Sequence, residues 1–418
     1  MTVTSQSIFD SESNLDRSYI RHTPTEYNES LSKRYGAEIY LKREDQQLVR
    51  SFKIRGAFTK IASLSDQEQS RGVVAASAGN HAQWVALTCA KLGIKGTIFM
   101  PQTTPSQKVR KTKSFGGAFI DVRLVGDTFN AAYDAAKLFC EETQGVFVHP
   151  FDDEQVIAGQ WTLACEILAD MESLAQKPID VMVVAIGGGG LIAGVWTVFK
   201  GYNQEWLLIG VESAGSASMK ASVTEWRPIN ISQVDTFCDG VAVKRPGDMT
   251  FSIAQKLVDD IVVLSDGHTA TTMLQLLDDQ GIITEPAWAL SIAALDEIQD
   301  IIRWKTVVCV VCGGNFDFTR LPAVEEKSLK RRGLKRYFII TFPQRPWALR
   351  EFLETLGPDD DIVRFEYMKK TAKEYGPALV GIQSFHPEHF ETLIERMTAQ
   401  TIAFEDITQQ EMYFDLLV

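Results

Sequence analysis

The chain has 418 residues, of which 45% are hydrophobic and 23% are charged, a composition typical of a soluble globular protein. This length predicts two or three domains whose apolar cores need no disulfide or metal to support them. The formal net charge of −12 argues against a general nucleic-acid partner, because such binding relies on clustered positive charge.

The six cysteines lie mostly inside apolar runs, which indicates reduced, buried thiols and a cytoplasmic protein. The first seventeen residues, MTVTSQSIFDSESNLDR, lack the apolar segment of a signal peptide, so we expect none.

From about residue 38 to 320, short apolar segments alternate with longer segments of helical character. Such alternation predicts an α/β fold with a mostly parallel sheet. The expected strands are Val73–Ala76, Gly96–Met100, Ala118–Leu124, Val181–Ile186, Leu207–Val211 and Thr306–Val311. The expected helices include Ala82–Leu92, Thr128–Glu142 and Ala158–Met171.

The uncharged stretch Val181–Phe199 is as long as a membrane span. Its four central glycines, Gly187 to Gly190, would weaken a continuous helix. We therefore predict a strand, a glycine loop and a helix from Leu191, and we expect no membrane partner.

A charged segment at 325–335, EEKSLKRRGLK, precedes a second pattern of strand, helix, strand, strand, helix and strand. The six elements are expected at Arg336–Phe342, Pro346–Leu356, Asp361–Tyr367, Leu379–Gln383, Pro387–Met397 and Thr401–Glu405. This order predicts a ferredoxin-like α+β domain. We divide the chain into a first domain at 1–320, a linker at 321–335 and a small domain at 336–418.

Two segments in the first half of the chain carry residues suited to chemistry. Lys53 lies among aromatic, aliphatic and small residues in SFKIRGA (51–57), where a lysine can lose part of its charge and form a Schiff base. The alternative is an ordinary surface lysine. The segment SAGNH (77–81) would place backbone amides at a helix start, which suits a carboxylate, or it is a tight turn capped by Asn80.

Two more segments follow predicted strands. The loop Gly187 to Leu191 (GGGGL) suits a phosphate and lacks the Lys-Ser/Thr pair of a nucleotide-binding P-loop. Cys309-x-x-Cys312 is similar to redox or zinc motifs, but residues three apart on a strand point to opposite faces. Cys312 would instead end its strand at the edge where parallel sheets place ligands. Glu212 and Glu285 are further candidates for site carboxylates.

Together these residue types indicate a site for pyridoxal 5'-phosphate. A lysine can supply the imine, a glycine loop the phosphate site, and Asn80 a contact to the ring oxygen, while a cysteine at a strand end can face the ring nitrogen. No metal site is expected.

The chain resembles the biosynthetic threonine dehydratase family in its short form, with one ACT-like regulatory domain. This family has fold type II of the pyridoxal-phosphate enzymes, which is similar to the tryptophan synthase β subunit. The resemblance covers essentially the whole chain. It rests on YLKRED (40–45), VRSFKIRGAF (49–58), ASAGNHAQ (76–83), FMPQTTPSQKV (99–109), HPFDDEQVIAGQ (149–160), IGGGGLIAG (186–194), DGVAV (239–243), EPA (285–287), CGGN (312–315) and FPQRPWALREFLETLGPDDDIVRFEY (342–367).

The resemblance implies a role for each matching residue. Lys53 would bond the cofactor, Phe52 would flank it, Asn80 would bind its ring hydroxyl and Cys312 would face its ring nitrogen. The cofactor phosphate would be bound by Gly187, Gly188, Gly189, Gly190 and Leu191. The substrate carboxylate would be held by Ser77, Ala78, Gly79, Asn80 and His81.

The resemblance also implies an activity and its setting. L-Threonine would be deaminated to 2-oxobutanoate and ammonia, the first step toward isoleucine, and isoleucine or valine would act as effector at the last domain. A homotetramer is the expected assembly. A catabolic serine or threonine dehydratase, or a racemase, is the enzymatic alternative.

Five tryptophans lie where the resemblance leads us to expect glycine: Trp84, Trp161, Trp196, Trp288 and Trp347. Three interpretations stay open. The chain is a repacked and active enzyme, or it is a catalytically impaired amino-acid-binding homologue. The third is that the recorded sequence contains errors at these positions, since one base change converts the glycine codon GGG to the tryptophan codon TGG.

Overall fold

The structure is a computed structural model that describes residues 17–174, 177–367 and 373–410. It divides into two compact units, Met1–Asp317 and Phe318–Val418. Among the helices it describes, none combines the length and apolar character needed to cross a bilayer.

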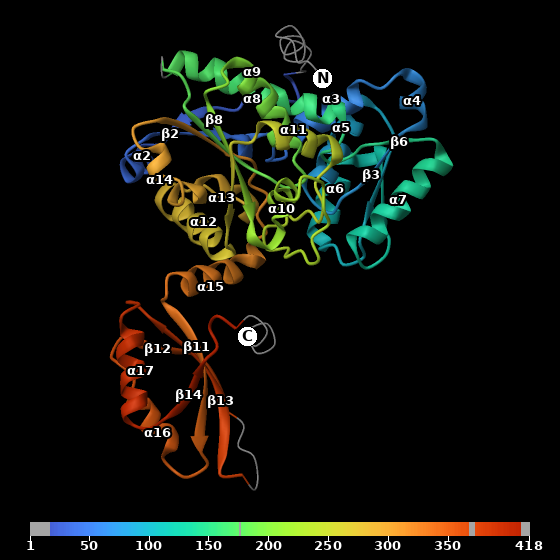
Figure 1. The fold of residues 1–418 in the computed structure, drawn as a ribbon. Coiled ribbons are helices and arrows are strands. Elements are labelled where there is room, and N and C mark those ends of the chain that lie inside the picture. Colours follow the sequence, from blue (N-terminus) through green and yellow to red (C-terminus); the bar gives the residue numbers. More distant parts are fainter. Residues whose placement is uncertain (1–16, 175–176, 368–372, 411–418) are drawn as a thin grey trace. The chain divides into compact units, whose positions relative to one another are not determined.

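The larger sheet of the first unit has six strands in the order β1-β2-β10-β7-β8-β9. Two of them, β2 and β8, are labelled in Figure 1. Their bounds are Thr25–Tyr27, Glu38–Arg43, Thr306–Val311, Val181–Ala185, Leu207–Ser213 and Asp260–Leu264. All neighbours are parallel except β1 and β2. The central strands β7 and β10 are buried along their whole length, because a parallel sheet has helices over both faces.

The smaller sheet of the first unit has four parallel strands in the order β5-β4-β3-β6. Their bounds are Ile120–Leu124, Gly96–Met100, Val73–Ala76 and Val146–Phe147. One apolar cluster joins this sheet to the two helices that carry predicted site residues, and its members include Ile54, Phe58, Ala75, Trp84 and Ile98.

Thirteen α-helices are described in the first unit. They are α2 (Glu29–Tyr35), α3 (Ile54–Ala62), α4 (Asp66–Arg71), α5 (Asn80–Leu92), α6 (Ser106–Gly116), α7 (Phe129–Thr143), α8 (Glu154–Leu174), α9 (Gly190–Tyr202), α10 (Ser218–Thr224), α11 (Asp248–Leu257), α12 (Asp266–Gln280), α13 (Pro286–Ala293) and α14 (Gln299–Ile302).

Most predicted elements of this unit are present, and the α/β prediction is confirmed. The strands β3, β4 and β10 have the predicted bounds. The strand expected from Ala118 was wrong at its start, because Gly117–Phe119 form a 3-10 turn and β5 begins at Ile120. The stretch Val181–Phe199 is a strand, a glycine loop and a helix, with α9 starting at Gly190 rather than Leu191.

The second unit begins with α15 (Leu321–Arg331), so the segment predicted as a linker is largely helical. Its sheet has the order β12-β13-β11-β14, with bounds Asp360–Tyr367, Tyr375–Ser384, Lys335–Pro343 and Ala403–Asp406. All pairs are antiparallel, and α16 (Ala348–Leu353) and α17 (His389–Ala399) complete the predicted ferredoxin-like order. The helix expected at Pro346–Leu356 is therefore shorter than predicted.

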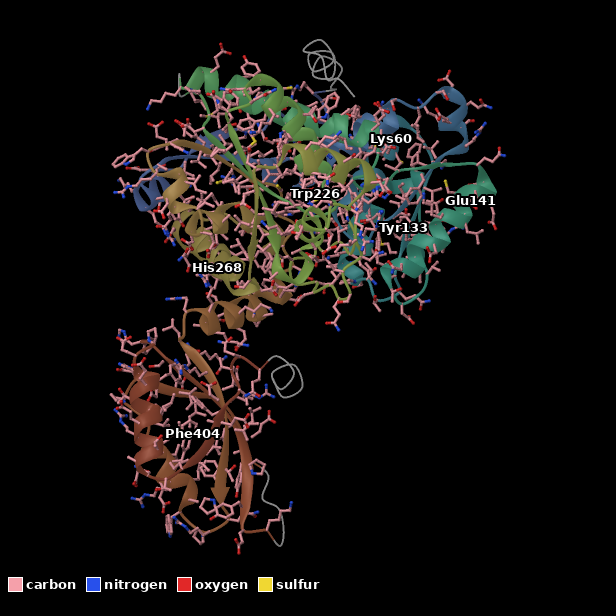
Figure 2. The ribbon with its side chains drawn as sticks, in the orientation of Figure 1. Lys60, Tyr133, Glu141, Trp226, His268 and Phe404 are labelled. Atoms are coloured by element: carbon pink, nitrogen blue, oxygen red, sulfur yellow. The ribbon has the colours of Figure 1, made fainter. Side chains whose placement is uncertain are left out.

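One apolar cluster forms the core of this second unit. Phe338, Phe352, Phe390 and Leu393 are fully buried in it, and Phe404 (labelled in Figure 2) packs against it. The sheet and its two helices thus share one core.

Candidate active site

Lys53 is the residue that immediately precedes α3. The segment before it is tied to the end of β10, because the Phe52 N–H donates to the carbonyl of Cys312 at 3.0 Å and Ser51 forms an isolated bridge with Gly313. Burial lowers the pKa of Lys53, and the nearby acidic groups Glu285 and Asp239 only partly oppose this. Burial therefore disfavours the charged ammonium form, so the neutral amine forms more readily than on an exposed lysine.

Asn80 is the first residue of α5, and its side chain does not cap the helix. Its amide instead donates to Glu285, at 3.0 Å to Oε1 and 3.3 Å to Oε2. Its carbonyl oxygen accepts from the Asn315 side chain at 2.7 Å, and the Asn315 N–H donates to Glu285 Oε1 at 3.0 Å. The alternative of a simple capping turn is thus wrong, and Asn80 belongs to a buried polar group with Glu285.

The glycine loop lies between β7 and α9, as predicted. Gly189 has φ +92, a conformation that suits glycine. A Cβ on Gly188 would lie 2.3 Å from the ring of Phe151, and one on Gly187 would lie 3.0 Å from the Cα of Val241. The carbonyl of Gly188 accepts from Thr250 Oγ1 at 2.6 Å, which pins the loop. Glycines here place the start of a thirteen-residue helix at the cavity, an arrangement that suits a phosphate.

Cys312 follows the last residue of β10 and is fully buried. Its thiol contacts the carbonyl of Val310 at 3.4 Å, and burial raises its pKa well above the ordinary value. The thiol is therefore neutral. Cys309 lies three residues earlier, on β10, and is a buried free thiol like Cys312, so the structure contradicts a disulfide interpretation of the C-x-x-C.

The segment Ser77–His81 runs from the end of β3 into the first two residues of α5. Ser77 Oγ accepts from the N–H of Gly79 at 3.2 Å. His81 Nε2 bonds the carbonyl of Val148 at 2.9 Å, and burial lowers the pKa of His81 to about 3. His81 is therefore neutral and engaged, so any attraction of this segment for a carboxylate comes from backbone amides and Asn80.

Trp288 lies among the groups that the sequence assigned to the cofactor ring. Its indole N–H donates to Glu285 Oε1 at 3.0 Å, the oxygen that also accepts from Asn80. Its ring meets Phe52 edge-on at 5.6 Å and lies 5.9 Å from Lys53 Nζ. A Cβ on Gly240 or on Gly313 would lie 2.8 Å from an indole atom, so the ring fills the space between them.

The cavity that remains is small. It is lined by Lys53, Phe52, Gly187 to Leu191 and Trp288 among others, and its volume is about 40 Å³. A cavity that holds benzene measures roughly 150 Å³. The lysine, the glycine loop and an unpaired buried acceptor, Gln160 Oε1, fit the predicted cofactor. The free space is too small for it, because the indole of Trp288 occupies part of the site, between Gly240 and Gly313.

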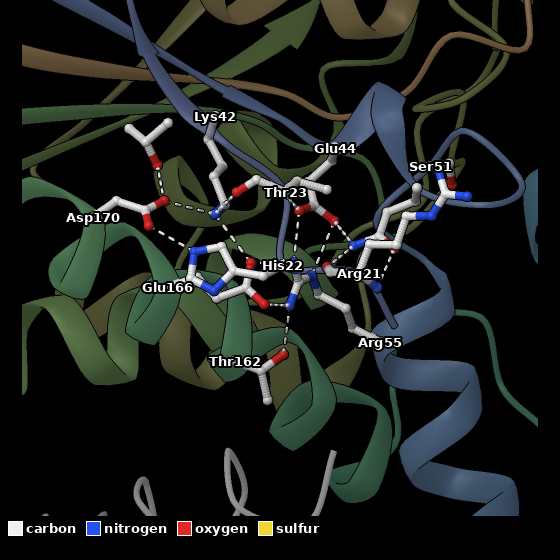
Figure 3. A network of polar contacts seen from close by, with 12 residues as sticks. Arg21, His22, Thr23, Lys42, Glu44, Ser51, Arg55, Thr162, Glu166 and Asp170 are labelled. Carbon is white, nitrogen blue, oxygen red and sulfur yellow. Dashed lines mark hydrogen bonds and ion pairs between the residues drawn. The ribbon is translucent and has the colours of Figure 1, made fainter. Parts of the chain in front are cut away.

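A buried charge network supports the segment that carries Lys53 (Figure 3). Arg55 donates to Glu44 at 2.7 and 2.9 Å and to Glu166 at 2.7 and 3.0 Å, and Lys42 lies 3.0 Å from Glu166. All four side chains are fully buried. The network joins β2, α3 and α8, so it holds the start of α3 in place.

Sequence reasoning missed this network and left Glu285 undecided. The other candidate carboxylate, Glu212, is not at the cavity. It accepts from the N–H groups of Met219 and Lys220 at 2.8 and 2.7 Å and so caps α10. The position of Glu285 directly after an apolar segment and before a proline was the available signal.

Comparisons with known families match both units. Residues 17–313 match the family described as pyridoxal-phosphate dependent enzymes. Residues 326–417 match the family described as the C-terminal regulatory domain of threonine dehydratase.

Individual relatives agree. The proteins named L-threonine dehydratase biosynthetic IlvA from Halalkalibacterium halodurans and Bacillus subtilis are each 48% identical to this chain over 95% of its length, covering 95% and 93% of theirs. Among solved structures, threonine deaminase isoform 2 from Solanum lycopersicum is 38% identical with a TM-score of 0.72, covering 78% of this chain and 94% of its own. Maize serine racemase is 29% identical with a TM-score of 0.71, covering 79% and 99%.

Proposed function

Because the chain belongs to the family of pyridoxal-phosphate dependent enzymes, we propose that it converts L-threonine to 2-oxobutanoate and ammonia. The observation that carries the proposal is the match of both parts of the chain. Relatives named as biosynthetic threonine dehydratases align over 95% of it, and the last part matches the regulatory domain of that enzyme. The regulatory match favours this enzyme over a catabolic dehydratase or a racemase.

The second unit is proposed to bind isoleucine, or valine, and to lower or raise the activity of the first. A homotetramer in the cytoplasm is proposed as the working form. The ferredoxin-like sheet and the match to a regulatory domain support the effector role.

The chain's own residues support a lysine-based site. Burial lowers the pKa of Lys53, which favours the neutral amine, the form that can act as nucleophile and proton acceptor. The amides at the start of α9 suit a phosphate, and the neutral thiol of Cys312 brings no charge to the site. Asn80 and Asn315 both donate to Glu285, so the Asn80 side chain is held in one orientation.

The test uses the protein purified from the cell that carries its gene. Threonine is added, 2-oxobutanoate is measured with and without isoleucine, and a second sample is reduced with borohydride, which locks the cofactor onto the lysine it is bonded to. We expect 2-oxobutanoate, a change in rate with isoleucine, and a pyridoxyl label on Lys53. A label on another lysine would refute the role of Lys53, and a protein without 2-oxobutanoate production would refute the reaction.

A further inference from the structure

Three tryptophans have backbone conformations that suit glycine. Trp226, Trp304 and Trp347 have φ of +55, +65 and +73. Among the described residues other than glycine, six have a positive φ, and three of these are tryptophans, although only 8 of the 418 residues are tryptophan. In this region the Cβ crowds the following carbonyl oxygen, so a bulky residue there is an outlier.

Nothing in the packing of these three side chains explains the strained backbone. Trp226 (labelled in Figure 2), Trp304 and Trp347 are 75%, 83% and 70% exposed. Trp226 lies two residues after the end of α10, in the region where helices commonly finish with a left-handed glycine. The N–H of Trp304 donates to the carbonyl of Gly36 at 2.9 Å, and its exposed ring contacts the guanidinium of the neighbouring Arg303 at 5.5 Å.

Two buried tryptophans have indole N–H groups without a partner in the described part of the chain. These are Trp161 on α8 and Trp196 on α9. A buried donor without an acceptor is unfavourable and uncommon. Each lies two residues after a glycine at a close helix contact: a Cβ on Gly159 would lie 2.3 Å from the carbonyl oxygen of Arg55, and one on Gly194 would lie 2.7 Å from that of Ile157.

Trp288 shows a third kind of conflict. Its indole takes the space between Lys53, Gly240 and Gly313 and leaves about 40 Å³ in a site whose other residues suit a cofactor. A residue without a side chain at 288 would open this space. The remaining two tryptophans show no such sign, because Trp84 donates to Ser51 Oγ at 3.0 Å and Trp206 packs on the rings of Phe199 and Tyr202.

Three unrelated conflicts at six tryptophans need a common cause. We propose that glycine occupies positions 161, 196, 226, 288, 304 and 347 in the protein that the cell makes. One codon supplies such a cause: UGA stops translation in the standard code, is read as tryptophan in some variant codes, and differs by one base from the glycine codon GGA. A tRNA that inserts glycine at UGA removes the positive-φ, unpaired-donor and blocked-cavity conflicts together.

The test is the mass of proteolytic peptides from protein purified from the cell that carries the gene. Peptides spanning the six positions are expected to be lighter than tryptophan requires, by the difference between an indolylmethyl group and a hydrogen atom. The peptide with Trp206 is the internal control and is expected to keep the tryptophan mass. Tryptophan found at any of the six positions overturns the common cause, whatever the activity of the protein.

A second measurement compares two recombinant full-length chains, the printed one and one with glycine at the six positions. Each is mixed with pyridoxal phosphate, and the visible absorption band is recorded, together with that of a Trp206→Gly control. The six-glycine chain is expected to gain a band that is lost on Lys53→Ala, whereas the printed chain and the control are expected to lack it. Equal bands in the printed and six-glycine chains would overturn the claim that Trp288 closes the site.

Discussion

Replacing Arg55 by methionine tests how the start of α3 is held. Arg55 makes four hydrogen bonds to Glu44 and Glu166, and all three side chains are fully buried. Burial opposes the charge of Glu166, but the guanidinium of Arg55 outweighs it and holds the pKa of Glu166 well below its ordinary value. Without Arg55, Glu166 still contacts Lys42, whereas Glu44 is left with the Thr23 hydroxyl and the Gln47 amide.

The expected loss of stability in Arg55→Met follows from the partners that Glu44 and Glu166 keep. Removing one partner of a buried ion pair costs about 3–5 kcal/mol, because a charge stays buried without compensation. Local opening of α3 and α8 should then be roughly a hundred-fold to a few thousand-fold more frequent, at about 1.4 kcal/mol for each factor of ten. Amide hydrogen exchange of peptides from these helices measures it directly. Lys33→Met, which removes an exposed pair with Glu29, is the control and should change nothing measurable.

The pH dependence gives the reasoning a second check. The folded pKa of Glu166 is lowered, so its contribution to stability is present above the ordinary value of 4.5 and is lost as the pH falls below it. The difference in stability between the parent chain and Arg55→Met should therefore be largest near pH 7 and should become smaller under acid conditions. Exchange rates in α3 of the variant that match those of the parent at pH 7 would refute the account. A stability difference that grows as the pH falls would also refute it.

Three further predictions concern single residues. Burial lowers the pKa of His81 from 6.5 to about 3, so the neutral ring stabilises the fold above pH 6.5 and this contribution is lost as the pH falls toward 3. The variant His81→Gln should therefore show a urea midpoint that depends less on pH between 7 and 5. A pH dependence equal to that of the parent chain would contradict this prediction. Gly188→Ala should destabilise the chain by about 1–3 kcal/mol, since its Cβ would meet the Phe151 ring at 2.3 Å. The control is Gly201→Ala on α9, the helix that follows this loop; its Cβ would meet nothing within 4 Å and should not destabilise the chain. Equal urea midpoints for both variants would refute the steric argument. The thiol of Cys312 has a raised pKa and is fully buried, so iodoacetamide should label the partly exposed Cys140 first in the folded protein. Labelled peptides identified by mass spectrometry provide the check, and Cys312 labelled before Cys140 would contradict the prediction.

The parts of the fold that could be predicted share one property: burial on both faces. The strands β3, β4 and β10 are runs of mainly small and apolar residues, so their bounds were readable. The carboxyl ends of β7 and β10 then brought the glycine loop and Cys312 to the same region, as parallel sheets do. Chain order alone was enough for this part of the site.

Buried charge was the part that could not be read. Glu38–Arg43 contains three charged residues in six, a composition typical of a surface segment. Lys42 is nevertheless fully buried, because it forms ion pairs with Glu166 and Asp170 on α8. Arg55 finds Glu166 111 residues away along the chain. A charge pattern in sequence carries no record of such partners, so only the three-dimensional arrangement turns a polar segment into an interior one.

Backbone conformation was hidden in a different way. The resemblance raised Trp347 and four buried tryptophans, but nothing around Trp226 or Trp304 in the sequence sets them apart from ordinary exposed aromatic residues. Their positive φ comes from the path that the chain must take after α10 and before β10, where Thr306 has to start its pairing with Glu38. The fold thus imposes a glycine-like turn whatever the side chain is. Tryptophan conflicts with a left-handed backbone at several separate turns, while the helices and strands on either side of each turn are regular. The conflict therefore points to the identity of the residue and not to an error in the fold.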